Sequence, residues 1–441
     1  MALSDTVGQG RIGVIGGGIG GLAVAQSLCR AGFAVDLYEQ DTELGGLAAR
    51  CTIGDLKLDK YYHFVCGADR ELVELCAELD LPIHWHPTKT SFYYEGKLYP
   101  FGSARHLLAF DALSLGERLR QAKMMLVASR GRDWRELDNI SAEEWLIRQL
   151  GEHAYQVIWH PLLKVKFGAR YQEISAAWIW HRVHRLLTSR RHPLAQELLG
   201  YMHQGAGELI ARMAQDIQAR SGQIYSGCQV QQVAQASAKQ WRVKSPRGEQ
   251  DYSAVVCAAP APAIKGLLGS DLVTDKLKQV EYIGVVCMLL VLDCPITNSF
   301  WINTNDSRIA FNGFIEFSNL NPKIAAGQHV LYIPYYCHTS DPRFSMADEA
   351  LFDEYLAALQ LISPKLGRKN VLHWRVYRDQ YAQPICTRGF ADKVPPFHGP
   401  GQGLFVMESS QLYPADRNLS GAVALANQVA QMAGNYLRES K

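Results

Sequence analysis

Apolar and polar residues near the start of the chain follow the order of a strand, a helix and a second strand. Two short apolar runs, Arg11–Ile15 and Ala34–Glu39, predict strands, and apolar residues at helical spacing from about Gly20 to Ala31 predict a helix between them. The chain is therefore expected to open with a βαβ unit.

The pattern changes in the next third of the chain. A hairpin is predicted at Tyr93–Tyr99, with its turn at Glu95-Gly96. From Arg105 to His203 the apolar spacing is helical, and Ser141 with Glu144 three residues later forms a predicted capping box. We expect this region to be an insertion into the opening domain.

Strand and helix patterns return after Gly205 and continue to the C-terminus. The opening unit, the region Gly205–Pro260 and the last strand and helix would be three pieces of one domain, separated by two long insertions. The elements predicted here are strands at Cys228–Val233, Ala254–Ala259 and Ile283–Leu292, a helix at Asp348–Ile362, a strand at Gly403–Glu408 and a helix at Ser420–Leu437.

The turn after the first predicted strand carries a glycine motif. Gly16, Gly18 and Gly21 form G-x-G-x-x-G between a predicted strand and a predicted helix. There the glycines allow a sharp turn that brings backbone amides to a pyrophosphate at the helix N-terminus. Glu39 closes the next strand about 20 residues on, where an acid that binds a ribose is expected. A dinucleotide site is therefore predicted. A second glycine pair, Gly45-Gly46, follows shortly after Glu39.

Composition narrows the class of protein. The 441 residues are 48% hydrophobic and 20% charged, with a net charge of +2, which is typical of a soluble globular protein and gives no argument for nucleic acid. The ten cysteines form no C-x-x-C pair and no metal-ligand spacing, so we expect buried thiols in the cytoplasm, no metal and no redox disulfide. No signal peptide is evident. No second glycine motif in a strand–turn–helix setting occurs, which disfavours a separate NAD(P)H domain.

His63 is the candidate for chemistry outside the glycine motifs. It lies in Asp59–Val65, shortly after the second glycine pair, and a neutral imidazole there could hydrogen-bond a cofactor ring or move a proton near neutral pH. Because aromatic residues flank it, a packing role is the alternative. Its neighbour Tyr62 is a candidate substrate contact.

Four basic residues form the strongest signal for a substrate. Arg182 and Arg185 share one helix face, and Lys164 and Lys166 lie upstream. A guanidinium can clamp a phosphate or a carboxylate, so a site for an acidic group is one interpretation and a solvated helix face is the other. Tyr381 is one of several aromatic residues that could line the cavity.

These residues together resemble the superfamily of FAD-dependent amine oxidases, protoporphyrinogen oxidases and phytoene desaturases. The likeness covers nearly the whole length and implies FAD, bound by a discontinuous Rossmann-type domain of an α/β protein with an inserted mixed substrate domain. It places the FAD domain at residues 1–85, 205–264 and 395–441 and the substrate domain at 86–204 and 265–394. The implied FAD contacts are Gly16, Gly18, Ile19, Gly20, Gly21, Glu39, Gln40, Gly45, Gly46, Leu47, Val230, Glu408, Asn418 and Leu419.

The chain departs from the superfamily at two points. Met407 precedes Glu408, where the relatives have glycine, and Tyr282–Leu292 lacks the lysine that holds a water against the flavin in polyamine oxidases. Locally the chain also resembles UDP-galactopyranose mutase, which implies that Arg182 approaches a diphosphate and His63 the flavin. Val165 and Phe167 replace the Gln and Trp usual in that enzyme.

The sequence therefore predicts an FAD-dependent oxidoreductase that takes a hydride from a C–C, C–N or C–O bond of an apolar or amphipathic small molecule. The first alternative is a mutase-like isomerase that acts on a nucleotide sugar. The second is a peripheral membrane flavoprotein, because Arg105–Trp134 combines leucines with arginines.

Overall fold

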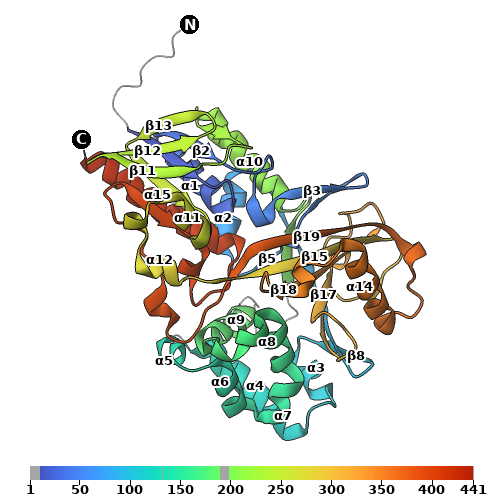
Figure 1. Cartoon of the computed structure of the whole chain (residues 1–441). Helices are drawn as coiled ribbons and strands as arrows, with labels where there is room; N and C mark the ends of the chain where they lie inside the picture. Colours follow the sequence, from blue (N-terminus) through green and yellow to red (C-terminus); the bar gives the residue numbers. More distant parts are fainter. Residues whose placement is uncertain (1–9, 132, 189–197, 441) are drawn as a thin grey trace.

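The computed structural model describes residues 10–131, 133–188 and 198–440. A parallel sheet with its helices lies in the upper part of Figure 1 and a helical insert in the lower part. Three long strands run between them: β15 (Tyr282–Leu292), β18 (His329–Cys337) and β19 (Val371–Pro384).

The first sheet has five parallel strands in the order β10-β2-β1-β14-β20. They come from three separate stretches of the chain, as the sequence pattern indicated, and the segments between them build the rest of the molecule. The strands are β1 (Arg11–Ile15), β2 (Ala34–Tyr38), β10 (Gln223–Tyr225), β14 (Ala254–Ala258) and β20 (Leu404–Met407).

Helices pack on this sheet and share its apolar core. α1 (Ile19–Arg30) contacts both α10 (Ala206–Ala219) and α15 (Leu419–Glu439), and α15 also contacts α2 (Arg70–Glu78). The predicted βαβ opening is confirmed, and its boundaries agree with the prediction to within one residue. A three-stranded antiparallel meander follows β10 and consists of β11 (Gln232–Ser237), β12 (Gln240–Ser245) and β13 (Gly248–Tyr252).

The second large sheet has seven strands in the order β19-β15-β18-β17-β16-β7-β8. β15 is buried along its whole length and pairs antiparallel with both β18 and β19, which explains its unbroken apolar run. The predicted hairpin is confirmed as β7 and β8 at one edge of the sheet. The remaining strands are β7 (Thr90–Tyr94), β8 (Lys97–Phe101), β16 (Trp301–Asn305) and β17 (Gly313–Glu316).

The helical insert follows this hairpin and packs against the second sheet through α8 and β18. The Ser141 half of the predicted capping box is formed, because the Ser141 hydroxyl accepts the Glu144 N–H at 3.1 Å. The helices are α3 (Ala104–Ala109), α4 (Leu115–Arg130), α5 (Arg135–Asp138), α6 (Ala142–Leu150), α7 (Glu152–Ala154), α8 (His160–Phe167) and α9 (Ala176–Thr188).

Two predictions of secondary structure are wrong. The helical pattern does not extend to His203, because β9 (Leu198–Met202) is a strand paired with β5 (Val65–Cys66) and β6 (Ile83–Pro87). A short apolar run fits either period, and here tertiary pairing decides. The strand predicted from Cys228 begins only at Gln232, because the Cys228 N–H donates to the carbonyl of Glu39 instead of joining a ladder.

The other elements connect these parts. α14 coincides with the predicted helix. Eight of the ten cysteines are buried. Within the described ranges, no helix has both the length and the apolar character needed to cross a bilayer. The remaining elements are β3 (Arg50–Ile53), β4 (Leu56–Asp59), α11 (Ala261–Leu267), α12 (Asp275–Gln279), α13 (Pro342–Ser345) and α14 (Asp348–Ile362).

Candidate functional site

The glycine turn after β1 and the second glycine pair lie side by side. The Gly45 N–H donates to the carbonyl of Gly17 at 2.8 Å, and Gly18 forms a parallel bridge with Gly45. Gly16 and Gly45 have φ values of 107° and 114°, which favour glycine. The two motifs that are adjacent in sequence therefore form one structure, which we call the glycine cradle (residues 16–21 and 45–46).

The N-terminus of α1 opens onto the glycine cradle. Its first turn has neither a side-chain cap nor an acidic residue. A Cβ at Gly18 would meet nothing within 4 Å, whereas a Cβ at Gly21 would lie 1.8 Å from the Gly16 carbonyl oxygen. The first amides of a helix, here those of Ile19 and Gly20, have no carbonyl partner within it, and the helix dipole favours an anion there. The cradle therefore fits the pyrophosphate of a dinucleotide.

The carboxylate of Glu39 is buried beside the cradle. Its Oε2 accepts the Gly17 N–H at 2.6 Å and its Oε1 accepts the Asp41 N–H at 2.9 Å. Burial raises the pKa of this carboxyl, while the two backbone amides oppose the rise. Glu39 thus lies one residue beyond β2, where the ribose contact is predicted. Of the other predicted contacts nearby, Gln40 is exposed and Leu47 is half-buried.

Val230 lies in the loop after β10, next to this acid. The Gly227 and Cys228 N–H groups donate to the carbonyls of Asp41 and Glu39 at 2.8 and 2.7 Å. Val230 itself is buried. The loop therefore brings the Val230 backbone close to the ribose end of the cradle, and its contact with adenine stays a prediction.

Glu408 follows β20 and is buried against the second sheet. Its Oε2 accepts the Tyr282 hydroxyl at 2.6 Å and the Ser410 N–H at 3.1 Å, and its Oε1 accepts the Ser410 hydroxyl. Burial raises the pKa of Glu408 to about 7, although Tyr282 and Ser410 act to lower it. Tyr381 stacks edge-on against Tyr282, with ring centroids 5.8 Å apart. Both Glu408 oxygens thus have protein partners, and the predicted ribityl contact stays a prediction.

The start of α15 lies close to the start of α1. A Cβ at Gly20 would lie 2.3 Å from the Met407 methyl group and 4.0 Å from the Ala422 carbonyl oxygen. Asn418 caps α15 by accepting the Gly421 N–H at 2.8 Å, and Leu419 is buried. The predicted cofactor residues at the two ends of the chain therefore converge on the same edge of the parallel sheet.

His63 lies near Asp59, in the segment between β4 and β5. Its Nδ1 is 3.8 Å from Asp59 Oδ2, and that nitrogen is buried without a hydrogen-bond partner among the described residues. Asp59 is engaged elsewhere, because its carboxylate accepts the N–H groups of Ala206 and Gly207 at 2.8 and 3.3 Å. The described residues therefore leave the hydrogen-bonding capacity of this nitrogen unused, and the catalytic role of His63 stays a prediction.

Tyr62 packs among aromatic side chains at the start of the second sheet. Its ring lies 5.5 Å from that of Trp301 and 6.1 Å from that of Tyr332. Burial raises the pKa of Tyr62, the charge of Tyr336 adds to the rise, and Arg182 opposes it. Among the described basic residues of the helical insert, Arg182 is the one that acts on Tyr62.

The four basic residues predicted as one substrate cluster divide into three groups. Lys166 and Arg182 both bind Oδ2 of Asp416, at 3.2 and 2.8 Å. Arg185 binds Asp69 instead, through two bonds of 2.6 and 2.9 Å. Lys164 is exposed. The direct ion pairs of these cations therefore involve two different carboxylates, and their role in substrate binding stays a prediction.

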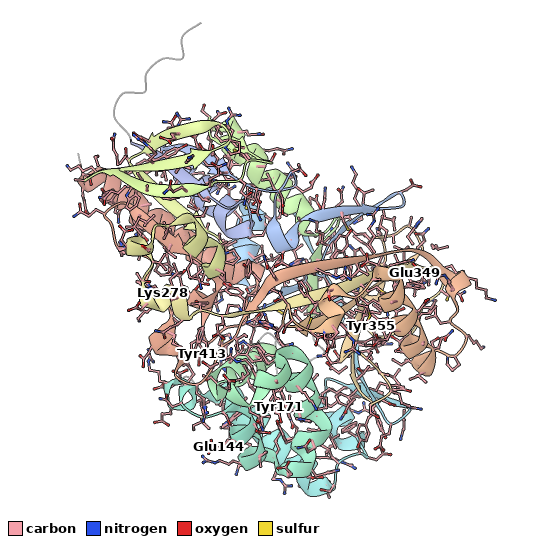
Figure 2. All side chains as sticks on the ribbon, in the orientation of Figure 1. Glu144, Tyr171, Lys278, Glu349, Tyr355 and Tyr413 are labelled. Carbon is pink, nitrogen blue, oxygen red and sulfur yellow. The ribbon has the colours of Figure 1, made fainter. Side chains whose placement is uncertain are left out.

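Asp416 and Arg417 were missed by the sequence reasoning. They lie in the loop between β20 and α15. In this loop the Tyr413 hydroxyl, whose residue is labelled in Figure 2, forms hydrogen bonds with Asp138 and with Ser175 of the helical insert, the latter at 2.7 Å. The sequence signal that could have identified them is an Asp-Arg pair just before the Asn418 cap, on the segment that returns to the cofactor domain. The charges of this loop therefore face the insert.

The parallel sheet, the glycine cradle and the large inserted part define a dinucleotide-binding protein. The chain belongs to the family described as flavin containing amine oxidoreductase, whose model matches residues 19–396. The expected superfamily, the fold class and the FAD cofactor are thereby confirmed.

The individual relatives carry the names of different enzymes. The 15-cis-phytoene desaturase of Synechococcus elongatus is 25% identical over 286 residues, which are 58% of this chain and 59% of the desaturase, so the match spans less than two thirds of that enzyme. A protein provisionally named a protoporphyrinogen oxidase from Exiguobacterium sp. 255-15 is 18% identical, with a TM-score of 0.76 and coverage of 98% of this chain and 100% of that one. Reduced UDP-galactopyranose mutase is 16% identical, with a TM-score of 0.73 and coverage of 96% and 95%. These structural likenesses show the fold.

Proposed function

We propose that the protein is an FAD-dependent oxidoreductase that takes a hydride from a C–C, C–N or C–O bond of an apolar or amphipathic substrate. The oxidised bond becomes a double bond, and the accompanying proton passes to solvent or to a nearby base. The observation that carries the proposal is the wall of aromatic and cationic side chains at the junction of the two parts. It comprises Tyr62, Tyr336, Trp178, Lys166 and Arg182.

Within this wall the chain's residues would bind and orient the substrate. Lys166 Nζ lies 4.6 Å from the ring centroid of Trp178 and 5.1 Å from that of Tyr336, so apolar faces and a positive charge are adjacent. Such faces exclude water from the apolar part of a ligand, and the cations fix its acidic end.

FAD, when bound, supplies the acceptor for the hydride. The glycine cradle and Glu39 would hold its nucleotide half. His63, whose buried Nδ1 has no partner among the described residues, would hold or move a proton. β15 contains no lysine, so a lysine-held water of the polyamine oxidase kind is not part of the proposal.

Anaerobic reduction tests this function. The purified holoprotein is mixed with saturated and unsaturated amphipathic acids, with amines and with hydroxy acids, and the flavin absorbance is followed. Bleaching by one class identifies the bond that is oxidised. A protein that binds no FAD, or a holoprotein that no class reduces, contradicts the proposal.

A second candidate is a mutase-like isomerase, which the Lys166 and Arg182 pair also favours because two cations beside an aromatic wall suit a diphosphate. Titration with UDP distinguishes the two. A tight change in flavin absorbance with UDP alone supports the isomerase, and no change with UDP or UDP-sugars supports the oxidoreductase.

A third candidate role is docking to an anionic membrane surface through the outer face of α3 and α4. Leu108, Leu115, Leu119 and Val127 are 54%, 62%, 58% and 59% exposed. On α4 the exposed charged residues are Arg120, Lys123 and Arg130, all of which are basic. The one acidic residue of α4, Glu117, is buried. Apolar side chains beside positive charge, with no exposed acid on the helix, complement an anionic lipid surface.

Co-sedimentation with vesicles tests this role. The wild type is expected to bind phosphatidylserine-containing vesicles more than neutral ones, and Leu115→Ser with Leu119→Ser to abolish the difference. Leu361→Ser, which replaces a leucine on α14 that is 37% exposed, serves as the control. Equal sedimentation of all variants contradicts membrane docking, as does a concentration-dependent dimer that the double variant disrupts.

A further inference from the structure

One carboxylate oxygen joins the helical insert to the cofactor domain. Oδ2 of Asp416 lies 3.2 Å from Lys166 Nζ and 2.8 Å from Arg182 Nη1. The side chains of Asp416 and Lys166 are 18% and 13% exposed, so this is a largely buried contact. The cations come from α8 and α9 of the insert, whereas Asp416 comes from the loop before α15.

This contact leaves hydrogen-bonding capacity unused. Oδ1 of Asp416 is buried and has no partner among the described residues, and the same is true of Nε of the adjacent Arg417. Buried polar atoms of native proteins are nearly always paired, and a guanidinium offers five donors. The unpaired Nε of Arg417 can donate to a further acceptor, such as the oxygen of an anion.

The charges around Asp416 are also unbalanced. Lys166, Arg182 and Arg417 all act on this single carboxylate. Burial opposes its ionisation, yet the three cations prevail and lower the pKa of Asp416 to about 2. Burial lowers the pKa of Lys166 to about 8, with Arg182 and Arg417 adding to the fall and Asp416 opposing it. An uncompensated buried charge costs free energy, which a bound anion would recover.

Neighbouring groups do not restore the balance. Arg185 is already paired with Asp69. Burial, with Arg185 and His184, lowers the pKa of His181 to about 4, so that its imidazole is neutral at pH 7. Asp379 interacts with Arg417 as well, and burial raises the pKa of Asp379 above its usual value. Three cations thus meet two carboxylates, Asp416 and Asp379, so a positive excess remains around Asp416.

We infer that Asp416 is an internal placeholder for the carboxylate of the substrate. The substrate carboxylate binds between Lys166, Arg182 and Arg417 and takes over the two cations that Asp416 holds in its absence. The inference rests on the proposed function, because it names the acidic end of that substrate. A carboxylate is favoured over a phosphate since the group already held there is itself a planar carboxylate, and Trp178 with Tyr336 would cover the carbon chain behind it.

Calorimetric titration of the FAD holoprotein with benzoate tests the inference. Asp416→Asn keeps the shape of the side chain but removes the competing charge, so its dissociation constant for benzoate is expected to fall at least about tenfold. Arg182→Gln is expected to raise it at least about tenfold. Arg170→Gln removes a cation from an ion pair with Glu173 and is the matched control, with no change expected.

The outcomes are decisive in each direction. Asp416→Asn that binds benzoate no more tightly than the wild type overturns the placeholder role. So does equal loss in Arg182→Gln and Arg170→Gln, or tighter binding of inorganic phosphate than of benzoate. If Asp416→Asn yields no folded flavoprotein, the contrast between Arg182→Gln and Arg170→Gln decides.

Benzoate gives up no hydride, so this experiment is independent of turnover. If the variants bind benzoate as expected but no substrate class bleaches the flavin, the carboxylate subsite stands and the oxidoreductase function is overturned. If uncharged substrates bleach the flavin and substitutions at Asp416 and Arg182 leave the affinity for benzoate unchanged, the oxidoreductase function stands and the carboxylate subsite is overturned.

Discussion

Replacing Glu408 by glutamine is expected to stabilise the protein at alkaline pH relative to the wild type. Glu408 is 4% exposed, and burial raises its pKa from 4.5 to about 7. Glutamine has nearly the same shape, and its amide oxygen can still accept the Tyr282 hydroxyl. The substitution therefore removes the cost of burying a charge while keeping the main hydrogen bond.

The sign and size follow from linkage between protonation and folding. Between the two pKa values the carboxyl of the unfolded chain releases its proton while the buried one keeps it, so the stability of the wild type falls as the pH rises through this window. One unit of pKa is worth about 1.4 kcal/mol. The shift from 4.5 to about 7 thus corresponds to about 3 kcal/mol, fully lost above the folded-state pKa.

Urea unfolding of both holoproteins from about pH 5 to about pH 8 measures this difference. The free energy of unfolding of Glu408→Gln minus that of the wild type should rise by up to about 3 kcal/mol across the series. Glu349→Gln, at an exposed ion pair with Arg368, should give a flat difference. A difference for Glu408→Gln that does not change with pH refutes the reasoning, as does a wild type that remains the more stable protein at the alkaline end.

Four further predictions use other contacts of the site. Tyr282→Phe removes the hydroxyl that donates to Glu408 at 2.6 Å, which raises the pKa of Glu408 further. In the same urea series, the free energy of unfolding should therefore continue to fall up to a higher pH than in the wild type. Gly18→Ala should fold but bind FAD weakly, because the position faces open space in the cradle, whereas Gly21→Ala should yield little folded protein; FAD titration and circular dichroism separate them. Benzoate affinity should fall above about pH 8 as Lys166 loses its proton, and Lys166→Arg should keep the affinity in the same calorimetric assay. Tyr413→Phe loses two hydrogen bonds to the helical insert and should lower the free energy of urea unfolding by about 1–3 kcal/mol.

The parts of the fold that local chemistry determines could be read from the sequence. The glycines at 16, 18 and 21 prescribe a turn, and the apolar run of β15 prescribes a buried strand, because each depends on residues adjacent in the chain. β9 could not be read in this way. Its five residues fit a helical or a strand period equally, and only pairing with β6, more than a hundred positions earlier, makes it a strand.

The substrate side was harder to predict for the same reason. Helical periodicity correctly placed Arg182 and Arg185 on one face of a helix, but it carries no information on which carboxylate meets each of them. Asp69 and Asp416 lie on opposite sides of these arginines in the sequence, so only the assembled fold assigns the pairs. Basic residues that lie close together in the sequence can thus divide in the fold between a complete ion pair and a second site that keeps an excess of positive charge.

The segment from Glu408 to Asn418 explains why the two ends of the site are linked. Within it, Glu408 binds the second sheet, Tyr413 binds the helical insert, Asp416 binds the two cations of that insert, and Asn418 caps α15. Each anchor fixes the segment against a different part of the molecule. A change of partner at Asp416 therefore alters the restraint on the cap of α15, whose first turn lies beside the glycine cradle. Binding of an anion between the helices of the insert and binding of FAD in the cradle act on one short piece of backbone, and by thermodynamic linkage any effect of one on the other is reciprocal.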